Sequence, residues 1–582
     1  MFTLRVSIVM RAVAAVAALA IAACSASSDG DASDPTAPGA AGVADVPNQT
    51  EAARFLTQAT FGPTEADIAE LTRVGYSEWF RRQLAAPITQ ATPDILALQV
   101  EYETRSESLG PGAIADFAWR AAIEQDDQLR QRMVFALSQI LVVSYDDPNV
   151  GDFFIVMAHY IDRLNANAFG SYRALLEDIT YTPAMASYLT YLNNQKENPE
   201  TGRVPDENYA RELMQLFTIG LVELNQDGTP RVDAQGAEIE TYDNEDITGL
   251  AKVFTGLSWA DDNFGGRGPQ NNVPSAVYSP LRVFPNEHST SEKQFLGVTI
   301  PANTPAEQSI DIALDTLMAH PNIAPFISKQ LIQRFVTSNP DAAYVTRVVN
   351  AFNAGVFTLP DRSTIGSRTR GDLAATLAAV LFDREARDLA RRNDNAFGRI
   401  REPVLRLTHW ARVADVNSAS VLAGDGLVDN NTLQDASTPT RLGQQQYRSP
   451  SVFNFYRPGY VAAGTETAAA GLVAPELQIT TTTSVTSYSN FMRSLIQEAR
   501  QDRTFLPSYA AEIDIAENPT ALVDRLNLLM TANSMTPETR TRIIDAVSSI
   551  SIRPDRIGED RRNRVNLAML MTVLSSEYTV QR

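Results

Sequence analysis

The sequence predicts a mainly α-helical protein, a large multi-helix globular fold with few short strands and two long loop insertions. Three observations lead to this prediction. Segments with apolar residues at helical spacing recur along the chain, between residues that favour helix ends. Alternating apolar and polar runs are too short to build a large sheet. Two long polar segments, 260–304 and 413–448, interrupt the helical pattern as loops.

The helical pattern begins near residue 50. Thr64 can cap a helix together with Asp67 three residues later, a spacing close to a capping box. A second helix is expected over 128–144, where apolar residues recur every three or four positions and form a stripe for burial. The segment 206–221 repeats this spacing. Together these segments predict an N-terminal helical region at 50–259.

The middle of the chain predicts a second helical region, at 305–412. An apolar repeat over 309–319 indicates one helix of this region. Pro321 suits the first turn of the next helix, because proline lacks an N–H that this turn would leave unpaired. The body of that next helix is expected at 326–336.

A C-terminal helical region is expected at 449–582. Thr536 followed by a proline predicts a helix start, and 562–578 keeps an apolar stripe. Two short strands are expected, at 237–241 and 298–300.

Composition excludes several classes of protein. The 582 residues include 49 Lys and Arg against 69 Asp and Glu, a net charge of −20. Such a charge opposes binding to nucleic acid, which depends on clustered Lys and Arg, so no nucleic-acid partner is expected. One cysteine and four histidines exclude a disulfide scaffold, an iron–sulfur cluster, a Cys-rich zinc site and a multi-His metal centre. No particular cofactor is indicated.

The first residues have the features of an export signal. Residues 1–23 combine two arginines with an apolar stretch, 12–23, that is too short to span a membrane. The sequence Ile-Ala-Ala-Cys ending at Cys24 resembles a bacterial lipobox, in which the cysteine is lipidated. The alternative is an ordinary signal peptide that happens to end at a cysteine. The lipobox is favoured because the single cysteine of the chain lies where that signal requires it.

A flexible tether is expected to follow the lipidated cysteine, over 24–49, because this segment is small, polar and rich in Gly and Pro. Two or more acyl chains hold a protein stably at a membrane. We therefore expect an exported, membrane-anchored lipoprotein that faces the periplasm or the cell surface. Ser25, in place of an aspartate, favours the outer membrane over the inner one by resemblance to the sorting rule of enteric bacteria.

Several motifs in order resemble the bacterial domain-of-unknown-function family 1800. The opening is Ala-Arg-Phe-Leu-Thr-Gln-Ala-Thr-Phe-Gly-Pro-Thr (53–64), and the most characteristic is Asp-Glu-Asn-Tyr-Ala-Arg-Glu-Leu-Met-Gln-Leu-Phe-Thr-Ile-Gly (206–220). Ser-Pro-Ser-Val-Phe-Asn-Phe-Tyr (449–456) is a third. The resemblance covers 50–582 as one unit. It implies an exported helical bacterial protein and no particular activity.

The chain departs from this family in one helix. Many members have a Trp-His-x-His cluster where this sequence reads Leu-Ser-Gln-Ile, at 137–140. If those histidines carry chemistry elsewhere in the family, this branch has lost it or moved it. This departure argues against a family-wide metal site operating here.

The helix expected from residue 206 carries the first candidate site. Asn208, Glu212 and Gln215 are spaced i, i+4, i+7 and share one face, with Arg211 beside them. Asn208, Arg211 and Gln215 are candidates for binding a polar ligand, and Glu212 is a candidate general acid or base. The structural alternative is a plain helix salt bridge between Glu207 and Arg211.

Two further candidates lie downstream. Asp246 belongs to a group of carboxylates at the expected start of a helix, where the helix dipole alone favours them. Together with Glu212 it could instead hold Ca²⁺ or Mg²⁺, although no twelve-residue calcium loop is present. His288, in a loop beside a glutamate, is a candidate base or ligand, or a residue that hydrogen-bonds a turn.

An aromatic-rich stretch follows the second loop. It contains Tyr447, Phe453, Phe455, Tyr456 and Tyr460, with arginines at 448 and 457. Such a stretch can stack a sugar or a peptide, or it can anchor core and loops.

Two functional hypotheses follow. The first is a binding or assembly protein that works with another exported partner, favoured because no His-Glu-x-x-His, Gly-x-Ser-x-Gly or Walker-type motif is present. The second is an envelope hydrolase or metal-assisted enzyme that uses Glu212, Asp246 and His288. That hypothesis requires these three side chains to meet in one pocket.

Overall fold

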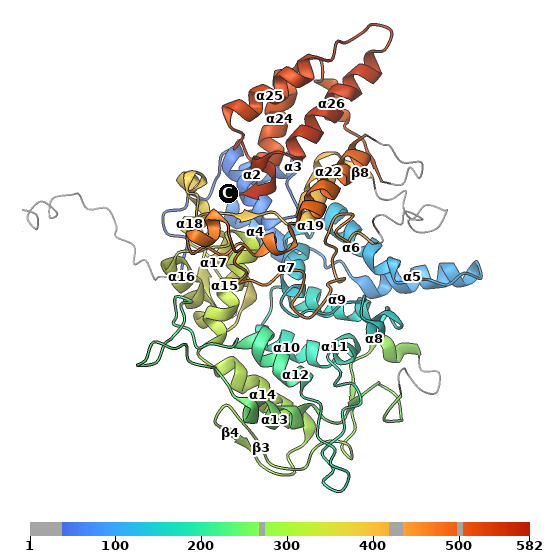
Figure 1. Cartoon of the computed structure of the whole chain (residues 1–582), viewed down its shortest axis with the longest axis vertical. Coiled ribbons are helices and arrows are strands. Elements are labelled where there is room, and N and C mark those ends of the chain that lie inside the picture. The colour runs from blue at the N-terminus through green and yellow to red at the C-terminus, as the bar shows by residue number, and fades with distance from the viewer. Residues whose placement is uncertain (1–37, 267–273, 418–432, 434, 498–504) are drawn as a thin grey trace, which may run out of the picture. The chain divides into compact units, whose positions relative to one another are not determined.

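The computed structural model describes residues 38–266, 274–417, 433, 435–497 and 505–582. The expected signal peptide, Cys24 and most of the expected tether lie outside the described residues, as do parts of the two loop insertions. Residues Pro38–Arg582 form one compact unit. The mainly α-helical fold class is confirmed, since helices make up most of this unit and the strands are very short (Figure 1).

The first part of the chain is a series of helices. These are α2 (Gln49–Ala59), α3 (Glu65–Val74), α4 (Tyr76–Ala85), α5 (Ala91–Thr104), α6 (Gly112–Glu124), α7 (Gln128–Ser138), α8 (Pro148–Gly151), α9 (Val156–Asn167), α10 (Tyr172–Thr180) and α11 (Pro183–Tyr188). α3 begins as the sequence predicts. The Thr64 hydroxyl accepts a hydrogen bond from the N–H of Asp67 (3.2 Å), and the Asp67 carboxylate accepts one from the N–H of Thr64 (2.8 Å).

Two predicted helices end early. The helix expected over 128–144 stops at Ser138, because the N–H of Gln139 turns back to the Ala136 carbonyl (3.3 Å) and the chain leaves the helix axis. The helix expected over 206–221 is a short α12 (Asn208–Glu212) followed by a six-residue π-helix, η1 (Leu213–Thr218). Both ends lie at the site described below.

The middle and the end of the unit are also helical. The elements are α13 (Asn244–Ala251), η2 (Lys252–Phe254), η3 (Pro274–Tyr278), α14 (Ala306–Ala319), α15 (Ile323–Phe335), α16 (Ala342–Ala354), α17 (Leu373–Leu381), α18 (Arg384–Arg387), η4 (Leu389–Asn393), α19 (Pro403–Val413), α21 (Glu466–Ala469), η6 (Pro475–Ile479), α22 (Thr482–Ile496), α23 (Ala510–Asp514), α24 (Pro519–Thr531), α25 (Pro537–Ser548), α26 (Ile557–Val573) and α27 (Ser576–Thr579). α24, α25 and α26 pack against one another (Figure 1).

Most of these helices match the sequence. α14 covers the helix expected at 309–319, and α25 starts at Pro537 with the Thr536 hydroxyl as its cap. α15 starts at Ile323, so Pro321 precedes the helix instead of lying in its first turn. The helix expected over 562–578 ends at Val573, and the short α27 follows it.

The strands form small antiparallel pairs. These are β1 (Leu257–Ser258) with β2 (Arg282–Val283), β3 (Lys293–Phe295) with β4 (Val298–Ile300), β5 (Phe357–Thr358) with β6 (Thr364–Ile365), β7 (Arg399–Ile400) with β10 (Val580–Gln581), and β8 (Val416–Asn417) with β9 (Leu506–Pro507). The strand expected at 298–300 is therefore confirmed. The segment 237–241 makes only isolated bridges, to Val222 and Val232.

The buried interior joins these helices into one core. α7 runs through it, with every residue from Gln128 to Ser138 buried. None of the helices in the described part of the chain combines the length and the apolar character that crossing a membrane requires.

Candidate functional site

A cleft of about 740 Å³ opens along α15. Its volume lies in the range of pockets that hold small ligands. We call it the α15 cleft, and it is lined by Gln139, Ile140, Gln215, Leu216, Gly220, Leu221, Val222, Leu224, Gly228, Phe326, Lys329, Gln330, Gln333, Arg334, Ser338, Asn339, Pro340, Val452, Phe453, Tyr456, Arg457, Pro458, Gly459, Gly471 and Val473.

One face of α15 forms a wall of the cleft. Phe326, Gln330 and Gln333 lie four and three residues apart, and helical geometry therefore places them in line. The Gln333 side-chain amide donates to the carbonyls of Ser338 (3.0 Å) and Pro458 (3.3 Å). These bonds fix the segment that carries Phe453 and Tyr456 against the helix.

The π-helix η1 contributes the facing residues. Its wider turn is held by the Thr218 hydroxyl, which donates to the Leu213 carbonyl five residues back (2.6 Å). π-helical turns occur often at functional sites. Gln215 and Leu216 of this turn line the cleft, so one of the three residues predicted to bind a ligand does lie at a cavity.

Glycine is required where η1 ends. Gly220 has φ +74°, in the left-handed region that favours glycine, and a Cβ atom there would lie 2.7 Å from the Phe326 ring. The absence of a side chain lets the Phe326 ring pack against the backbone at this wall.

Below the cleft lies a cluster of charges that we call the buried arginine cluster: Arg132, Arg334, Arg399, Glu402 and Glu476. Arg399 pairs with Glu402 (2.6 Å) and with Glu476 (2.7 Å). Arg132 instead donates to the Arg334 carbonyl and lies over the Phe335 ring, 4.5 Å from its centroid. Three guanidinium groups thus face two carboxylates, which leaves one positive charge in excess.

Arg334 connects this cluster to the cleft. Its two terminal nitrogens donate to the carbonyls of Gln330 (3.3 Å) and Gln139 (3.0 Å), and neither is paired with a carboxylate in the described residues. Burial lowers the pKa of Arg334 and lowers that of Arg132 to about 9, because a desolvated cation is disfavoured.

Four buried polar atoms on residues that line the cleft have no hydrogen-bond partner among the described residues. They are the Gln139 Oε1, Gln330 Nε2, Arg334 Nε and Tyr456 Oη atoms. Each of these residues is less than a tenth exposed. A buried polar atom without a partner costs about 1–3 kcal/mol, so protein interiors normally satisfy it with protein, water or ligand.

The charges at the cleft have one sign. Lys329, Arg334 and Arg457 line it, and none of its described lining residues is a carboxylate. Arg457 lies over the Phe453 ring, 4.4 Å from the centroid, and the Lys329 ammonium donates to the Gly228 carbonyl (3.2 Å). Burial lowers the pKa of Lys329, and the nearby Asp227 opposes this shift.

The other predicted binding residues lie outside the cleft. Arg211 forms the helix salt bridge with Glu207 (3.3 Å) that the sequence offers as the structural alternative. The Asn208 side-chain amide donates to the Thr190 hydroxyl (3.4 Å).

Glu212 is buried, and one of its carboxylate oxygens has no partner in the described residues. Burial raises its pKa, while Arg211 acts in the opposite direction. The Tyr242 hydroxyl nearby also lacks a partner, and burial, reinforced by Glu212, raises the pKa of Tyr242 to about 12. These are features of a carboxyl group in a poorly solvated position.

Asp246 and His288 make local structural contacts. Asp246 accepts from the N–H of Asp243 (3.0 Å) in the capping box of α13, and from the N–H of Leu296 (2.6 Å). His288 is buried, and its Nδ1 donates to the Thr255 carbonyl (2.9 Å) while Nε2 has no partner among the described residues. Burial lowers its pKa.

The structure does not join the three predicted catalytic residues by any hydrogen bond between described residues. Glu212, Asp246 and His288 each contact different groups, and none of them lines the α15 cleft. The described part of the chain contains no group of three His, Cys, Asp or Glu side chains placed to hold a metal ion.

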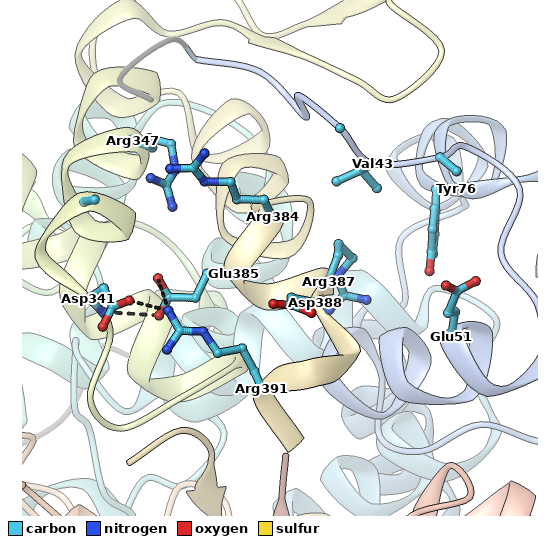
Figure 2. A pocket seen from close by; sticks show the side chains of 13 residues that line it. Val43, Glu51, Tyr76, Asp341, Arg347, Arg384, Glu385, Arg387, Asp388 and Arg391 are labelled. Atoms are coloured by element: carbon cyan, nitrogen blue, oxygen red, sulfur yellow. Dashed lines mark hydrogen bonds and ion pairs between the residues drawn. The ribbon is translucent and has the colours of Figure 1, made fainter. Parts of the chain in front are cut away.

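A second pocket was not anticipated from the sequence. We call it the arginine pocket; it has a volume of about 550 Å³ and is lined by Gly42, Val43, Ala44, Glu51, Tyr76, Asp341, Ala343, Arg347, Arg384, Glu385, Arg387, Asp388 and Arg391 (Figure 2). The dense run of charges over 383–392 was the available signal. In Figure 2 Arg391 reaches toward Asp341 and Glu385, and its distance to the Glu385 carboxylate is 3.9 Å.

Sequence reasoning anticipated only part of the α15 cleft. The aromatic stretch supplies Phe453 and Tyr456, together with Arg457. Gln139 and Ile140, from the segment at which the sequence was expected to depart from its family, also line the cleft. Lys329, Gln330 and Arg334 were missed, since on the sequence they are polar positions of an ordinary amphipathic helix.

The comparisons with known proteins agree with the sequence motifs. A family model described as Protein of unknown function (DUF1800) matches residues 54–580, which is nearly the whole chain. No curated protein and no solved structure matches it. The motifs, the extent of the match and the helical fold lead to one assignment: the chain belongs to the DUF1800 family.

Proposed function

We propose that this protein is a lipid-anchored protein of the bacterial envelope whose task is binding, and that the α15 cleft is its binding site. The observation that supports this is the combination of an open cleft with buried, unpartnered polar atoms on the residues that line it. Amides, cations and apolar surface line the cleft, and pockets that bind small ligands combine apolar surface with a few polar groups in this way. A second exported protein that delivers or receives the ligand is part of this proposal.

The enzymatic alternative uses Glu212, Asp246 and His288. It would gain support if substitution of each residue abolished one hydrolytic activity of the purified chain. Glu212 has the environment of a general acid, because burial raises its pKa and one oxygen is unpaired. Asp246 and His288 have structural partners, which is why binding is the better-supported function.

Native mass spectrometry of the protein released gently from envelopes tests the binding function. The blocking variant is Gly459→Trp: Gly459 lines the cleft, its φ is not positive, and a side chain built there meets no atom within 4 Å. We expect the unchanged protein to carry a bound small molecule and this variant to lose it. Gly110→Trp is the matched control, because Gly110 is equally unobstructed and does not line the cleft. Equal retention of the molecule by both variants would contradict the proposed site.

The lipid anchor has its own test, which is a prediction about Cys24. Replacing Cys24 with serine removes the thiol that carries the lipid, so we expect incorporation of labelled palmitate to fall to background. The incorporated label is measured in cells that make the unchanged protein and the serine variant at equal levels. Undiminished labelling of the serine variant would refute the anchor and leave an ordinary export signal.

A further inference from the structure

The unpartnered polar atoms on residues that line the α15 cleft are mostly donors. Gln330 Nε2 and Arg334 Nε offer N–H groups, and the Tyr456 hydroxyl can donate as well, whereas Gln139 Oε1 is the only one that solely accepts within this described set. A ligand group rich in acceptors and poor in donors fits this surplus. Carboxylates and phosphates have this character, and they form the stronger, charge-assisted hydrogen bonds.

The charge of the cleft points to the same chemistry. The whole chain carries a net charge of −20, yet the cleft is lined by Lys329, Arg334 and Arg457 and by no carboxylate among its described residues. The buried arginine cluster beneath it has one positive charge in excess. Among the described residues Arg334 donates hydrogen bonds to carbonyls only, while the nearby carboxylates of Glu402 and Glu476 are paired with Arg399. An anion in the cleft would compensate a charge that is otherwise costly to bury.

Much of the remaining surface of the cleft is apolar. Phe326, Leu221 and Val452 line it together with Phe453 and Val473. Leu221 is 56% exposed. An inorganic anion alone would leave this surface uncovered, whereas an alkyl or ring portion attached to the anion would cover it.

We propose that the ligand of the α15 cleft is a small anionic amphiphile, a carboxylate or phosphate carried on an apolar body. The anionic group lies near Arg334, Tyr456 and Gln330, and the apolar part packs against Phe326 and Phe453. This inference rests on the proposed function. The shared chemistry has two sources in an envelope: a free single-chain molecule in solution, or an anionic lipid in the membrane.

Calorimetry on the chain from residue 25 onward tests the proposal, since residues 38–582 form one compact unit. The probes are decyl phosphate and decanoate, with decyl maltoside, decyltrimethylammonium and inorganic phosphate for comparison. We expect the two anionic amphiphiles to bind at least about tenfold more tightly than the neutral and the cationic ones, because the cleft is complementary only to an anion. Inorganic phosphate binding as tightly as decyl phosphate would overturn the amphiphilic part of the proposal.

Arg457→Gln checks the role of charge at an exposed position. We expect it to weaken decyl phosphate binding about fivefold and to leave decyl maltoside unchanged, because it removes one partly solvated charge. Arg457→Lys should restore most of the affinity. Arg542→Gln, an exposed arginine of α25 outside the cleft, is the control and should bind like the unchanged chain. Equal loss in both glutamine variants would contradict the proposal.

Two further arms separate the possible outcomes. Vesicles of phosphatidylcholine and phosphatidylglycerol at four to one, compared with pure phosphatidylcholine, test the membrane source. Binding to the anionic vesicles that Gly459→Trp abolishes supports a lipid ligand, and binding to soluble decyl phosphate alone supports a free one.

Tight binding of decyl maltoside that Gly459→Trp abolishes would refute the anionic ligand and leave the binding function intact. Absence of binding by every anionic probe and vesicle would also refute the anionic ligand. In that case, a molecule from the envelope retained in native mass spectrometry would still support the α15 cleft as a binding site.

Discussion

The α15 cleft and the arginine pocket are both lined by arginines, but the two regions differ in the acidic residues that accompany those arginines. The arginine pocket holds four arginines, Arg347, Arg384, Arg387 and Arg391, and four acids, Glu51, Asp341, Glu385 and Asp388 (Figure 2). Three cations line the α15 cleft, and its described lining includes no acid.

The contacts of these charges differ as well. In the arginine pocket Arg347 forms a two-point pair with Asp383 (2.6 and 2.8 Å), and Arg391 pairs with Asp341 and Asp394. In the described part of the chain, Arg334 and Lys329 of the cleft donate hydrogen bonds to backbone carbonyls only. Arg387 of the arginine pocket donates to Gln58, and its Nε has no partner among the described residues. The arginine pocket nevertheless supplies as many acids as arginines. The described lining of the α15 cleft supplies cations and no acid, so an anionic ligand would balance it, and for this reason we propose binding at the α15 cleft.

The largest effect is expected from the pair between Arg347 and Asp383. Both side chains are nearly inaccessible, at 9% and 4% exposure, so removing the carboxylate deprives a buried guanidinium of its two-point partner. Asp383→Ala should lower the free energy of unfolding by about 3–5 kcal/mol. Urea unfolding provides the measurement. Asp524→Ala, which removes the partner of Arg540 at an exposed site, is the control and should cost no more than about 1 kcal/mol. Similar losses in the two variants would mean that the arginine pocket is not held by its charges.

A pH effect is expected from Glu385. Burial raises its pKa to about 7, against an ordinary value near 4.5, so the folded chain binds a proton here that the unfolded chain has already released. The stabilisation by this group is complete below about pH 4.5 and is lost as the pH rises to about 7.

Comparison with Glu385→Gln isolates this effect, since the glutamine stays neutral and keeps a carbonyl to accept from the N–H of Asp341. The quantity compared is the free energy of unfolding of the variant minus that of the unchanged chain. We expect this difference to be about 2–4 kcal/mol larger at pH 8 than at pH 4. Urea unfolding at both pH values gives the numbers. A difference that does not change with pH would show that folding leaves the pKa of Glu385 unchanged, so that Glu385 is ionised at pH 7 and the arginines and acids of the arginine pocket balance.

A smaller effect is expected at the wall of the α15 cleft, which is shaped by close packing. Gly220→Ala combines a left-handed backbone with a methyl group 2.7 Å from the Phe326 ring, and should lower the free energy of unfolding by about 2–3 kcal/mol. Gly202→Ala is the matched control: its φ is +75° and nothing lies within 4 Å of the added atom. It should cost only the backbone term, about 1 kcal/mol. Equal costs would mean that the Phe326 ring moves freely and that the wall is not fixed by packing.

The sequence predicted those parts of the fold that local signals determine. The capping box of Thr64 and Asp67 and the Thr-Pro start of α25 depend on residues three apart or adjacent, and both were found where expected. The ends of α7 and α12 were predicted too late. Gln139 leaves the helix to donate to Glu402, 263 residues away in sequence, and the wide turn of η1 packs against α15. Spacing within one segment does not report such long-range contacts.

The same limit applies to the site. Phe453 and Tyr456 were noticed because aromatic residues cluster in sequence, and Gln215 because it lies on a polar helical face. Arg334 lies in an amphipathic helix like many others. Its role depends on the hydrogen bond to the Gln139 carbonyl and on the neighbouring charges of Arg399 and Glu402. A residue whose role depends on two distant segments leaves no pattern in its own segment.

The smallest effect is expected at the helix salt bridge of Arg211 and Glu207, and it bears on which face of α12 and η1 is functional. Both side chains are partly exposed, at 41% and 31%, so Arg211→Gln should lower the free energy of unfolding by about 0.3–0.5 kcal/mol. It should leave decyl phosphate binding unchanged, because Arg211 does not line the α15 cleft. Gln215→Ala, four residues further on, removes an amide from the cleft and should weaken that binding about fivefold, a loss typical of one net hydrogen bond. If Arg211→Gln weakened binding and Gln215→Ala did not, the ligand would lie on the outer face of α12 near Glu212. The cleft would then be a structural feature like the arginine pocket, and the difference between the two regions would lose its functional meaning.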